Sequence, residues 1–489
     1  VVTTLENSNI SNVGISNIGL YVDTLGRTKP LDMEGVTSLP SGNNTLLFGV
    51  EAAEKTNSKE IIVKDEILDR FSQYLTGFSS FTPDSASFTP DSASLTWLLQ
   101  PVLDSSGNIA RIVMAKRDYT TFAIPGDTNT YNFTDGLEQR YGVEGIGNRE
   151  KELFNRLNSI QNGEEALLSQ AFEQMEGHEY ANTQQRIKNA DDLLDNGIDG
   201  LFNWNTKTKK SNKVKLIGTE SEYNTDTAGV VNYKDKSLGI VYLNENESIK
   251  LGDTWGIYGG LLYDEAKFDD IGESKEEGMT GQLGIFKSTS FDVNNSLNWT
   301  VALEGEFGQR KMNRKYLVVD EIFGAKSDFY TYGAEIKNKV SKSIRLSEGL
   351  SVVPSASLDL GYKTFSNISE NSGEMKLEVK ADDYFSAKPA LNLDLVYKAK
   401  LGRTLNLTGT AGLTFEYELA NGSGVTNQAK VKNTTADYYD LAKDEFTRSS
   451  GVAKVGIGID NNVFGITLDG EYNTQGSDTK GTLGFRLIF

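Results

Sequence analysis

Cysteine and histidine are almost missing from this sequence of 489 residues, which has no cysteine and a single histidine, His178. Without thiols the chain can form neither a disulfide nor a thiolate metal site. One imidazole excludes a histidine-based metal cluster. Because there is also no Gly-x-Ser-x-Gly motif, a Ser-His-Asp triad has almost no support. The sequence therefore predicts no enzyme activity, no catalytic residue, no metal site and no bound cofactor.

Positive charge and long apolar runs are also scarce. The net charge of −19 argues against nucleic acid as a partner, because such binding depends on lysine and arginine that neutralise phosphates. The chain has no run of about 20 apolar residues that could form a transmembrane helix. Its opening, "VVTTLENSNI", lacks the basic and apolar regions of a signal peptide. We therefore expect either that the mature protein starts there or that the sequence is the C-terminal piece of a longer one.

The second half of the chain alternates apolar and polar residues with period two. Between residues 405 and 419, leucines and aromatic residues share one face, whereas Asn406, Thr408 and Thr410 share the other. Each segment of this kind is about 10–15 residues long, which suits a tilted membrane-spanning strand. We count about twelve segments, starting near residues 213, 236, 253, 278, 295, 327, 348, 383, 403, 449, 462 and 480.

This alternation predicts an all-β fold with a 12-stranded antiparallel transmembrane β-barrel. A soluble sandwich also alternates, but its strands average about 5–6 residues. The apolar faces here carry aromatic residues near the strand ends, as in the interfacial girdles of membrane barrels. Because an open edge cannot exist in hydrocarbon, the twelve strands must close, first against last. We expect the last strand to be held by the first, with an outward series at Leu483, Phe485, Leu487 and Phe489.

The opposite faces of these strands carry charge and glycine, as the wall of a barrel lumen would. Glu304 and Glu306 resemble an acid–base dyad, but a spacing of two on a strand only places both side chains on the same face. We therefore interpret such pairs as lumen lining. The predicted wall residues are Glu304, Glu306, Glu335, Asp359, Asp394, Glu416, Glu418 and Arg486.

Residues 148–204 switch to the helical period. Their last helix, Asn182–Phe202, is mostly polar with a thin apolar stripe, so it needs polar surroundings on most sides. A helix of about 21 residues is roughly 31 Å long, close to the hydrocarbon thickness of a membrane. We predict that it plugs the barrel, and that Arg186 and Lys188 face the acids of the wall. The plug residues are Asn182, Arg186, Lys188, Asp191 and Asp192.

Residues 1–135 have a different texture, with short β-like runs between turns. "ISNVG" and "ISNIG" (residues 10–19) repeat directly, which fits either the last coils of a β-solenoid or a plain hairpin. The exact repeat "FTPDSAS" (residues 81–94) is most simply a surface loop that tolerated a duplication. "NIARIVMAKRDYTTFA" follows the turn "DSSGN" and indicates a capping hairpin.

Residues 130–489 resemble the type Va autotransporters of Gram-negative bacteria. "LLSQAFEQMEGHEYANTQQRIKNADDLLDNG" is similar to the helical linker that threads the barrel in that family. "NKVKLIGTESEYNTDTAGVVNYKDKSLGIVYLNENE" resembles its first hairpin, and "GTLGFRLIF" resembles its last strand with a terminal aromatic residue. "YNFTDGLEQRYG" and "RKYLVVDEIFGAKSDFYTYG" are similar to segments of large fusobacterial-type autotransporter adhesins.

The resemblance implies an outer-membrane translocator that exports an N-terminal passenger, an adhesin or virulence factor, and anchors it at the cell surface. It implies three parts: the end of a β-helical passenger with an autochaperone-like cap (1–130), a helical linker (131–205) and the barrel (206–489). The implied partners are outer-membrane lipid, periplasmic chaperones and the barrel assembly machinery, which reads the outward series of the last strand. The barrel would act as a monomer, and the passenger would bind host or other bacterial cells.

Three other functions stay open at this point: an outer-membrane porin or receptor with a soluble N-terminal domain, an outer-membrane enzyme, and the translocator of a secreted serine protease. A porin has no reason to keep a long polar helix before its first strand. Some relatives cut themselves inside the barrel at an Asn-Asn pair in the linker helix. Here Asn182, Asn189 and Asn196 stand apart, so we expect an uncleaved passenger.

Overall fold

The computed structural model describes residues 17–30, 44–75, 88–204, 209–250, 252–420, 424–443, 448–461 and 463–489. The chain divides into two compact units, which are described separately. The first comprises Val1–Glu173 with the short segments Val318–Glu321 and Asn433–Thr435, and the second comprises the remainder. Among the helices in the described ranges, none combines the length and the apolar character that crossing a membrane requires.

Three short parallel strands begin the first unit: β1 (Gly19–Val22), β2 (Asn44–Phe48) and β4 (Phe88–Ser92). They pair side by side in the order β1-β2-β4 without a register shift, as successive rungs of a solenoid do. Most of the repeat at residues 10–19 and the first "FTPDSAS" copy lie outside the described residues. The second copy contains β4, so this half of the duplication is a strand rather than the predicted surface loop.

Short helices in the first unit are not evident from the sequence pattern. We expected only β runs before residue 135, and the structure has helices there. Three of them span four to six residues, which is less than two turns, so no helical period can be recognised in them. The helices are α1 (Glu51–Thr56), α2 (Asp65–Arg70), α3 (Ser72–Leu75) and, crossing residue 135, α4 (Thr128–Arg140).

The predicted capping hairpin consists of β5 (Trp97–Leu103) and β6 (Ile109–Lys116), and β3 (Glu60–Ile62) pairs with the other edge of β6. A 3₁₀ turn, η1 (Tyr119–Phe122), follows, and its Tyr119 ring packs against aromatic rings of α5 and α6. The predicted boundary at residue 130 lies within α4, and the compact unit continues to Glu173. The remaining helices are α5 (Asn148–Asn158) and α6 (Glu165–Met175), both in the span with helical period.

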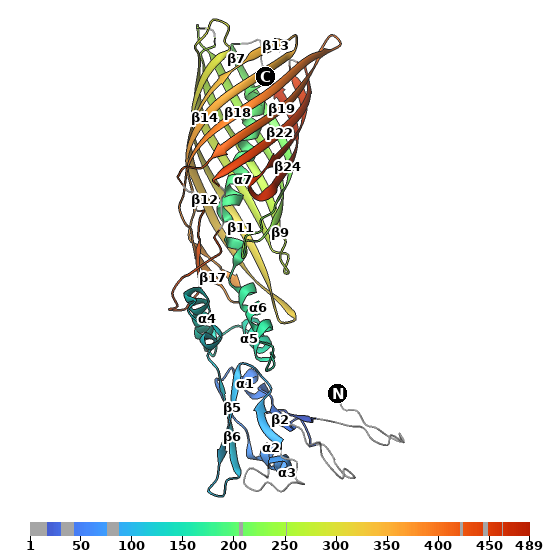
Figure 1. Cartoon of the computed structure of the whole chain (residues 1–489), viewed down its shortest axis with the longest axis vertical. Helices are drawn as coiled ribbons and strands as arrows, with labels where there is room; N and C mark the ends of the chain where they lie inside the picture. The colour runs from blue at the N-terminus through green and yellow to red at the C-terminus, as the bar shows by residue number, and fades with distance from the viewer. Residues whose placement is uncertain are drawn as a thin grey trace, which may run out of the picture. The chain divides into compact units, whose positions relative to one another are not determined.

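Twelve long antiparallel strands of the described chain close into a barrel, which confirms the predicted fold (Figure 1). Each predicted start lies within six residues of the observed one. Their bounds are β7 (Lys210–Tyr223), β8 (Tyr233–Glu247), β9 (Thr254–Phe268), β10 (Lys275–Ser290), β11 (Leu297–Val318), β12 (Glu321–Lys342), β14 (Leu350–Phe365), β18 (Tyr384–Leu401), β19 (Leu405–Tyr417), β22 (Ser449–Asp460), β23 (Phe464–Asn473) and β24 (Asp478–Ile488).

The first and last strands close the barrel. β24 pairs with β7, placing Phe485 opposite Leu216 and Leu487 opposite Val214. The strands are longer than expected on one side: β11 and β12 have 22 residues each, against the predicted 10–15. The extra length continues beyond the apolar face, where alternation persists but most outward residues are polar or charged, such as Lys311, Lys315 and Lys326.

The outward face of the barrel changes from apolar to charged along one line. Glu220, Lys236, Glu265 and Glu277 lie side by side in register on β7 to β10 and point outward. Two residues further along each strand, towards the middle of the barrel, Leu238, Tyr263 and Met279 are exposed on the same face. Exposed aromatic residues follow this line around the barrel, as interfacial girdles do: Tyr263, Phe307, Tyr330, Tyr332, Phe385, Tyr417 and Tyr472.

A single helix, α7 (Thr183–Phe202), runs along the inside of the barrel, as predicted (Figure 1). A 3₁₀ turn, η2 (His178–Tyr180), precedes it. Two loops of the barrel form a small additional sheet in the order β15-β17-β20-β21, which the sequence pattern did not indicate. Its strands are β15 (Ile368–Ser369), β17 (Leu377–Lys380), β20 (Gln428–Val431) and β21 (Tyr439–Asp440), while β13 (Ile344–Ser347), β16 (Ser372–Gly373) and η3 (Gln475–Ser477) are short additions to the barrel.

Candidate functional site

The lumen of the barrel and the helix inside it form the candidate functional site. Fourteen of the twenty residues of α7 are buried, including charged and amide side chains. A helix with this much polar surface cannot lie in lipid, but the wall of the barrel supplies partners for it. The charges of the two surfaces fall into layers along the helix.

The first layer lies near the N-terminal end of α7. Arg186 donates two hydrogen bonds of 2.9 Å to the Glu276 carboxylate of β10. Arg310 of β11 donates to Glu276 at 2.8 Å and to Asp264 of β9 at 2.9 Å. All four side chains are at most 4% exposed, so two cations and two anions balance each other away from water.

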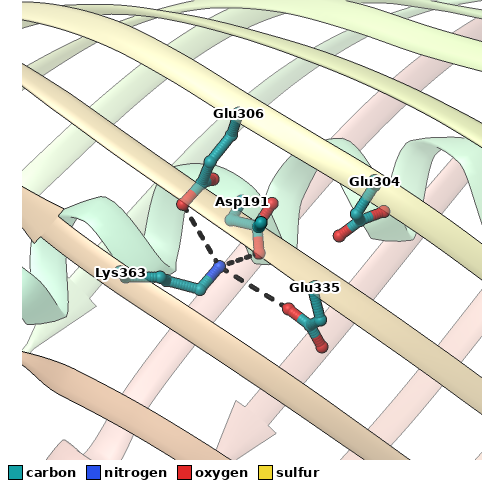
Figure 2. Close-up of a pocket in the computed structure, with 6 residues that line it drawn as sticks. Asp191, Glu304, Glu306, Glu335 and Lys363 are labelled. Atoms are coloured by element: carbon teal, nitrogen blue, oxygen red, sulfur yellow. Dashed lines mark hydrogen bonds and ion pairs between the residues drawn. The ribbon is translucent and has the colours of Figure 1, made fainter.

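The second layer surrounds two lysines of the wall, Lys363 and Lys337. Figure 2 shows the carboxylates around Lys363. Lys363 of β14 bonds to Asp191 of α7 and lies 3.5 Å from Glu306 and 3.7 Å from Glu335. Lys337 of β12 reaches Asp195 of α7 at 2.5 Å, and it also reaches Glu304 at 2.6 Å. Here the helix supplies acids and the wall supplies the cations between them.

Three carboxylates of this layer come close enough to one another to suggest a metal site. Ligand atoms of Asp191, Asp195 and Glu304 all lie within 4.8 Å of one another. However, the Lys337 ammonium contacts two of these groups, and the Gln282 side-chain amide donates to both aspartates at 3.0 and 2.9 Å. Donors from the protein therefore already occupy the positions beside these oxygens, and the geometry fits a lysine-centred network better than a metal.

The opposite side of α7 contacts the last strands. Asp192 bonds to Lys188 one turn away at 2.6 Å and lies 4.0 Å from Lys480 of β24. Asn196 donates to Glu471 of β23 at 3.0 Å and accepts from Lys454 of β22 at 2.7 Å. These contacts tie the helix to the closing seam of the barrel.

The C-terminal half of α7 packs in an apolar part of the lumen, which we did not predict. Leu194 is fully buried, and a Cβ added at Gly260 of β9 would lie 2.7 Å from its Cδ2, so the absence of a side chain at Gly260 makes room for the helix. Near the C-terminal end of α7, the Lys213 ammonium donates a hydrogen bond of 2.9 Å to the Leu201 carbonyl. The cluster comprises Ala190, Leu193, Leu194, Ile198, Leu201, Trp204, Ile217, Val241, Leu243, Tyr258, Leu262, Phe286 and Ala302.

The predicted partners of the helix cations are correct only in part, because Lys188 interacts electrostatically with the wall acid Glu416, which we had named. Arg186 pairs with Glu276, which we had not named, and Lys188 pairs with Asp192 of its own helix. The acids Glu304 and Glu306 instead lie level with Asp191, about five residues or roughly 7 Å further along the helix. The sequence held a usable signal, because the basic positions 337 and 363 fall on the same inward faces as the wall acids.

The other predicted wall residues contact the wall itself. Glu418 accepts from Ser386 at 2.6 Å, Glu416 lies 3.9 Å from Lys388, and Asp394 accepts from Asn392 at 2.5 Å. Asp359 stands in register between Lys337 and Lys388 on the neighbouring strands. Arg486 donates to Asp460 at 2.6 Å and lies over the Trp204 ring at 4.4 Å.

Two more groups of predicted residues have clear positions. Asn182 directly precedes α7 and donates to the Val231 carbonyl of the β7–β8 loop at 2.8 Å. The four residues of the outward series on the last strand are all exposed, at 41 to 68%, whereas Arg486 between them is buried. The series comprises Leu483, Phe485, Leu487 and Phe489.

The comparison with known protein families agrees with this architecture. The family model described as the autotransporter beta-domain matches residues 214–473, more than half of the chain. Similar solved structures include the translocator domain of NalP from Neisseria meningitidis (TM-score 0.47, 11% identity, 64% of this chain and 100% of that one). Another is the β-domain of the Bordetella autotransporter BrkA (TM-score 0.39, 15% identity, 57% of this chain and 99% of that one). A third is the transport unit of AIDA-I from Escherichia coli (TM-score 0.37, 13% identity, 61% of this chain and 98% of that one).

No curated protein sequence matches the chain. The family match begins within β7, the first strand of the barrel, and ends with β23. It therefore covers every strand of the lumen wall except β24. A closed barrel with one helix in its lumen, and a family match over most of that barrel, together identify the molecule: this chain belongs to the autotransporter β-domain family and is an outer-membrane translocator of the type Va class.

Proposed function

We propose that the barrel exports the N-terminal part of the chain to the cell surface and then keeps it attached. The observation that carries this proposal is the position of α7 in the lumen. In the sequence, α7 comes after the first unit and before β7, the first strand of the barrel, so in this proposal the chain itself passes through the barrel. A helix held by ion pairs to the wall in three directions, two of them buried, supports retention rather than release.

The exported passenger, in this proposal, acts by binding host or other bacterial cells, and neither passenger nor barrel is an enzyme. The stacked parallel strands β1, β2 and β4 support a passenger that ends in a β-solenoid, a shape that presents an extended surface. The barrel assembly machinery would recognise the exposed series from Leu483 to Phe489, and periplasmic chaperones would keep the passenger unfolded before export. The barrel would act as a monomer.

Protease treatment of intact cells tests export. A protease that cannot cross the outer membrane should digest the first unit while α7 and the barrel stay protected. A first unit that is digested only after the outer membrane has been permeabilised would contradict the proposal.

Adhesion of cells tests the role of the passenger. Cells that display the chain should bind target cells more strongly than matched cells producing the same barrel without residues 1–173. Equal binding by the two strains, with equal amounts of barrel, would contradict a binding role for the part of the passenger present here.

A further inference from the structure

The small sheet β15-β17-β20-β21 belongs to two long loops at one end of the barrel (Figure 1). We call residues 366–383 and 424–443 the collar. We call residues 175–184, which join α6 to α7, the neck. Apart from Asn433–Thr435 of the collar, both lie in the second unit. The collar is well packed, since Leu377, Val379, Ala429 and Val431 are at most 1% exposed.

The neck is buried although most of it is not regular α-helix. Tyr180, Ala181 and Asn182 are fully buried. Gly177 ends the preceding helical segment with a φ of +85°, and a Cβ there would lie 2.6 Å from Leu377 of the collar. The neck therefore follows a fixed path with the collar against it.

The first polar contact between collar and neck is built on Glu370, which is fully buried. Its carboxylate accepts two hydrogen bonds from Arg314 of β11, at 2.8 and 3.0 Å, and one from the Tyr180 hydroxyl at 3.0 Å. Arg314 also donates to the Met175 carbonyl at 3.2 Å. One buried ion pair thus holds a side chain and a backbone group of the neck.

The second polar contact is built on Asn427, also fully buried. Its side-chain amide donates to the Tyr180 carbonyl at 2.8 Å and exchanges two hydrogen bonds with the Gln184 amide, at 2.7 and 2.9 Å. Gln184 in turn donates to the Asp382 carbonyl at 2.9 Å. From another strand, Tyr439 donates to the Glu176 carbonyl at 2.9 Å.

We propose that the collar is a lock whose ligand is the neck, and that its closure fixes where the exported chain stops. The contacts depend on register, because Tyr180 and Gln184 each meet a buried partner that a slip of one residue would remove. The charges along α7 specify position less tightly, since a lysine can exchange one carboxylate for another. The lock rests on the proposed function, because export is what brings the neck to this end of the barrel.

Cysteine labelling tests the lock in the full chain, since the natural sequence has no cysteine. Ala181→Cys reports on the buried neck, and Ser169→Cys on exposed α6 reports on export itself. Intact cells are treated with a maleimide carrying a polymer too large for the pore. With the lock closed, we expect Cys labelling at position 181 to be at least about 100-fold slower than at position 169, as expected for a group that reacts only in a rarely opened state.

Two isosteric changes separate the lock from general damage. Asn427→Asp removes the donors to the neck, whereas Asn294→Asp makes the same chemical change on an exposed side chain of the β10–β11 loop, outside the collar. Asn427→Asp should raise labelling of Ala181→Cys about tenfold or more, because buried carbonyls lose their donor. Asn294→Asp should leave the rate unchanged, and heat-modifiable mobility should confirm a folded barrel in both.

Tyr180→Phe provides a second variant on the neck side if Asn427→Asp fails to assemble, and it should also raise labelling. Equal rates for the Asn427→Asp and Asn294→Asp variants, or no effect of Tyr180→Phe, would overturn the lock. Fast labelling of Ala181→Cys in the otherwise natural chain would overturn it as well. Absence of labelling at Ser169→Cys in intact cells would instead overturn export, and so distinguishes failure of the proposed function from failure of the lock.

Discussion

Buried charges of the lumen are arranged so that the helix contributes both signs to different layers. Arg186 brings a cation to the acids of β9 and β10, and Asp191 and Asp195 bring anions to Lys363 and Lys337. A buried ion pair adds little net stability, because each charge loses its hydration, but removing one partner leaves the other uncompensated. Replacing one charged residue of the lumen should therefore lower stability, even where the intact ion pair adds little to it.

Lys363→Met tests this sensitivity. The change leaves Asp191, Glu306 and Glu335 near one another without their shared cation, so the barrel should lose about 3–5 kcal/mol of stability. Urea unfolding of the protein folded in lipid vesicles measures the loss. Lys236→Met is the control, because Lys236 pairs with Glu220 on the exposed surface and such pairs contribute little. Similar midpoints for the two variants would contradict a specific role of the Lys363 network.

Glu138 of α4 should make the first unit sensitive to acid. Burial alone would raise the pKa of its carboxyl group, but the Lys116 ammonium at 2.5 Å and the Tyr119 backbone N–H hold this pKa below the ordinary value of 4.5. Because the unfolded chain then binds the proton more readily, this contribution to stability is present above pH 4.5 and is lost as the pH falls through the folded-state pKa.

The measurement for Glu138 is the urea midpoint of the first unit in the full chain, between about pH 7 and pH 3. The midpoint should fall in acid, and Glu138→Gln should lower it at neutral pH while flattening its dependence below pH 4.5. A variant with the same acid dependence as the natural chain would assign that dependence to other carboxyl groups.

At the scale of strands and helices, the alternation of period two predicted most of the barrel. The alternation specifies which face of each strand is apolar. Because turns interrupt it, the predicted start of each strand also lies within six residues of the observed start. The collar was not predicted, since its strands have two to four residues and too few positions to show a period. The partners of Arg186 were missed for a different reason: the sequence gives the faces of the strands but not how far along α7 each wall residue lies.

Strand β19 offers a direct test of the two faces. Leu413 is 65% exposed on the outer face, whereas Thr408 lies on the inner face. Leu413→Arg should cost about 2–4 kcal/mol in refolding titrations with lipid, because a charge near the middle of the bilayer loses its hydration. Thr408→Arg should cost less, since the lumen can hydrate or pair the guanidinium. A larger loss for Thr408→Arg would mean that the register is shifted by one residue.

At the scale of the whole molecule, one chain supplies the pore and what fills it. A twelve-stranded barrel lies between the eight-stranded barrels, which side chains fill, and the sixteen-stranded porins, which stay open. A single helix is therefore a suitable filling, and α7 contacts β7, β8, β9, β10 and β14. In the proposed export, the segment that crosses the barrel last would also close it, so export and sealing would use the same residues.

Conductance in planar bilayers tests this coupling of export and sealing. The full chain should give small and rare openings, because α7 and the collar obstruct the lumen. Removing residues 1–173 should change little, since the neck and α7 remain in place. Removing residues 1–202 should give a larger and steadier pore, because the barrel wall then has no helix against it. If the chain without α7 conducts no more than the full chain, the helix does not obstruct the pore, and the barrel must be sealed by its own loops.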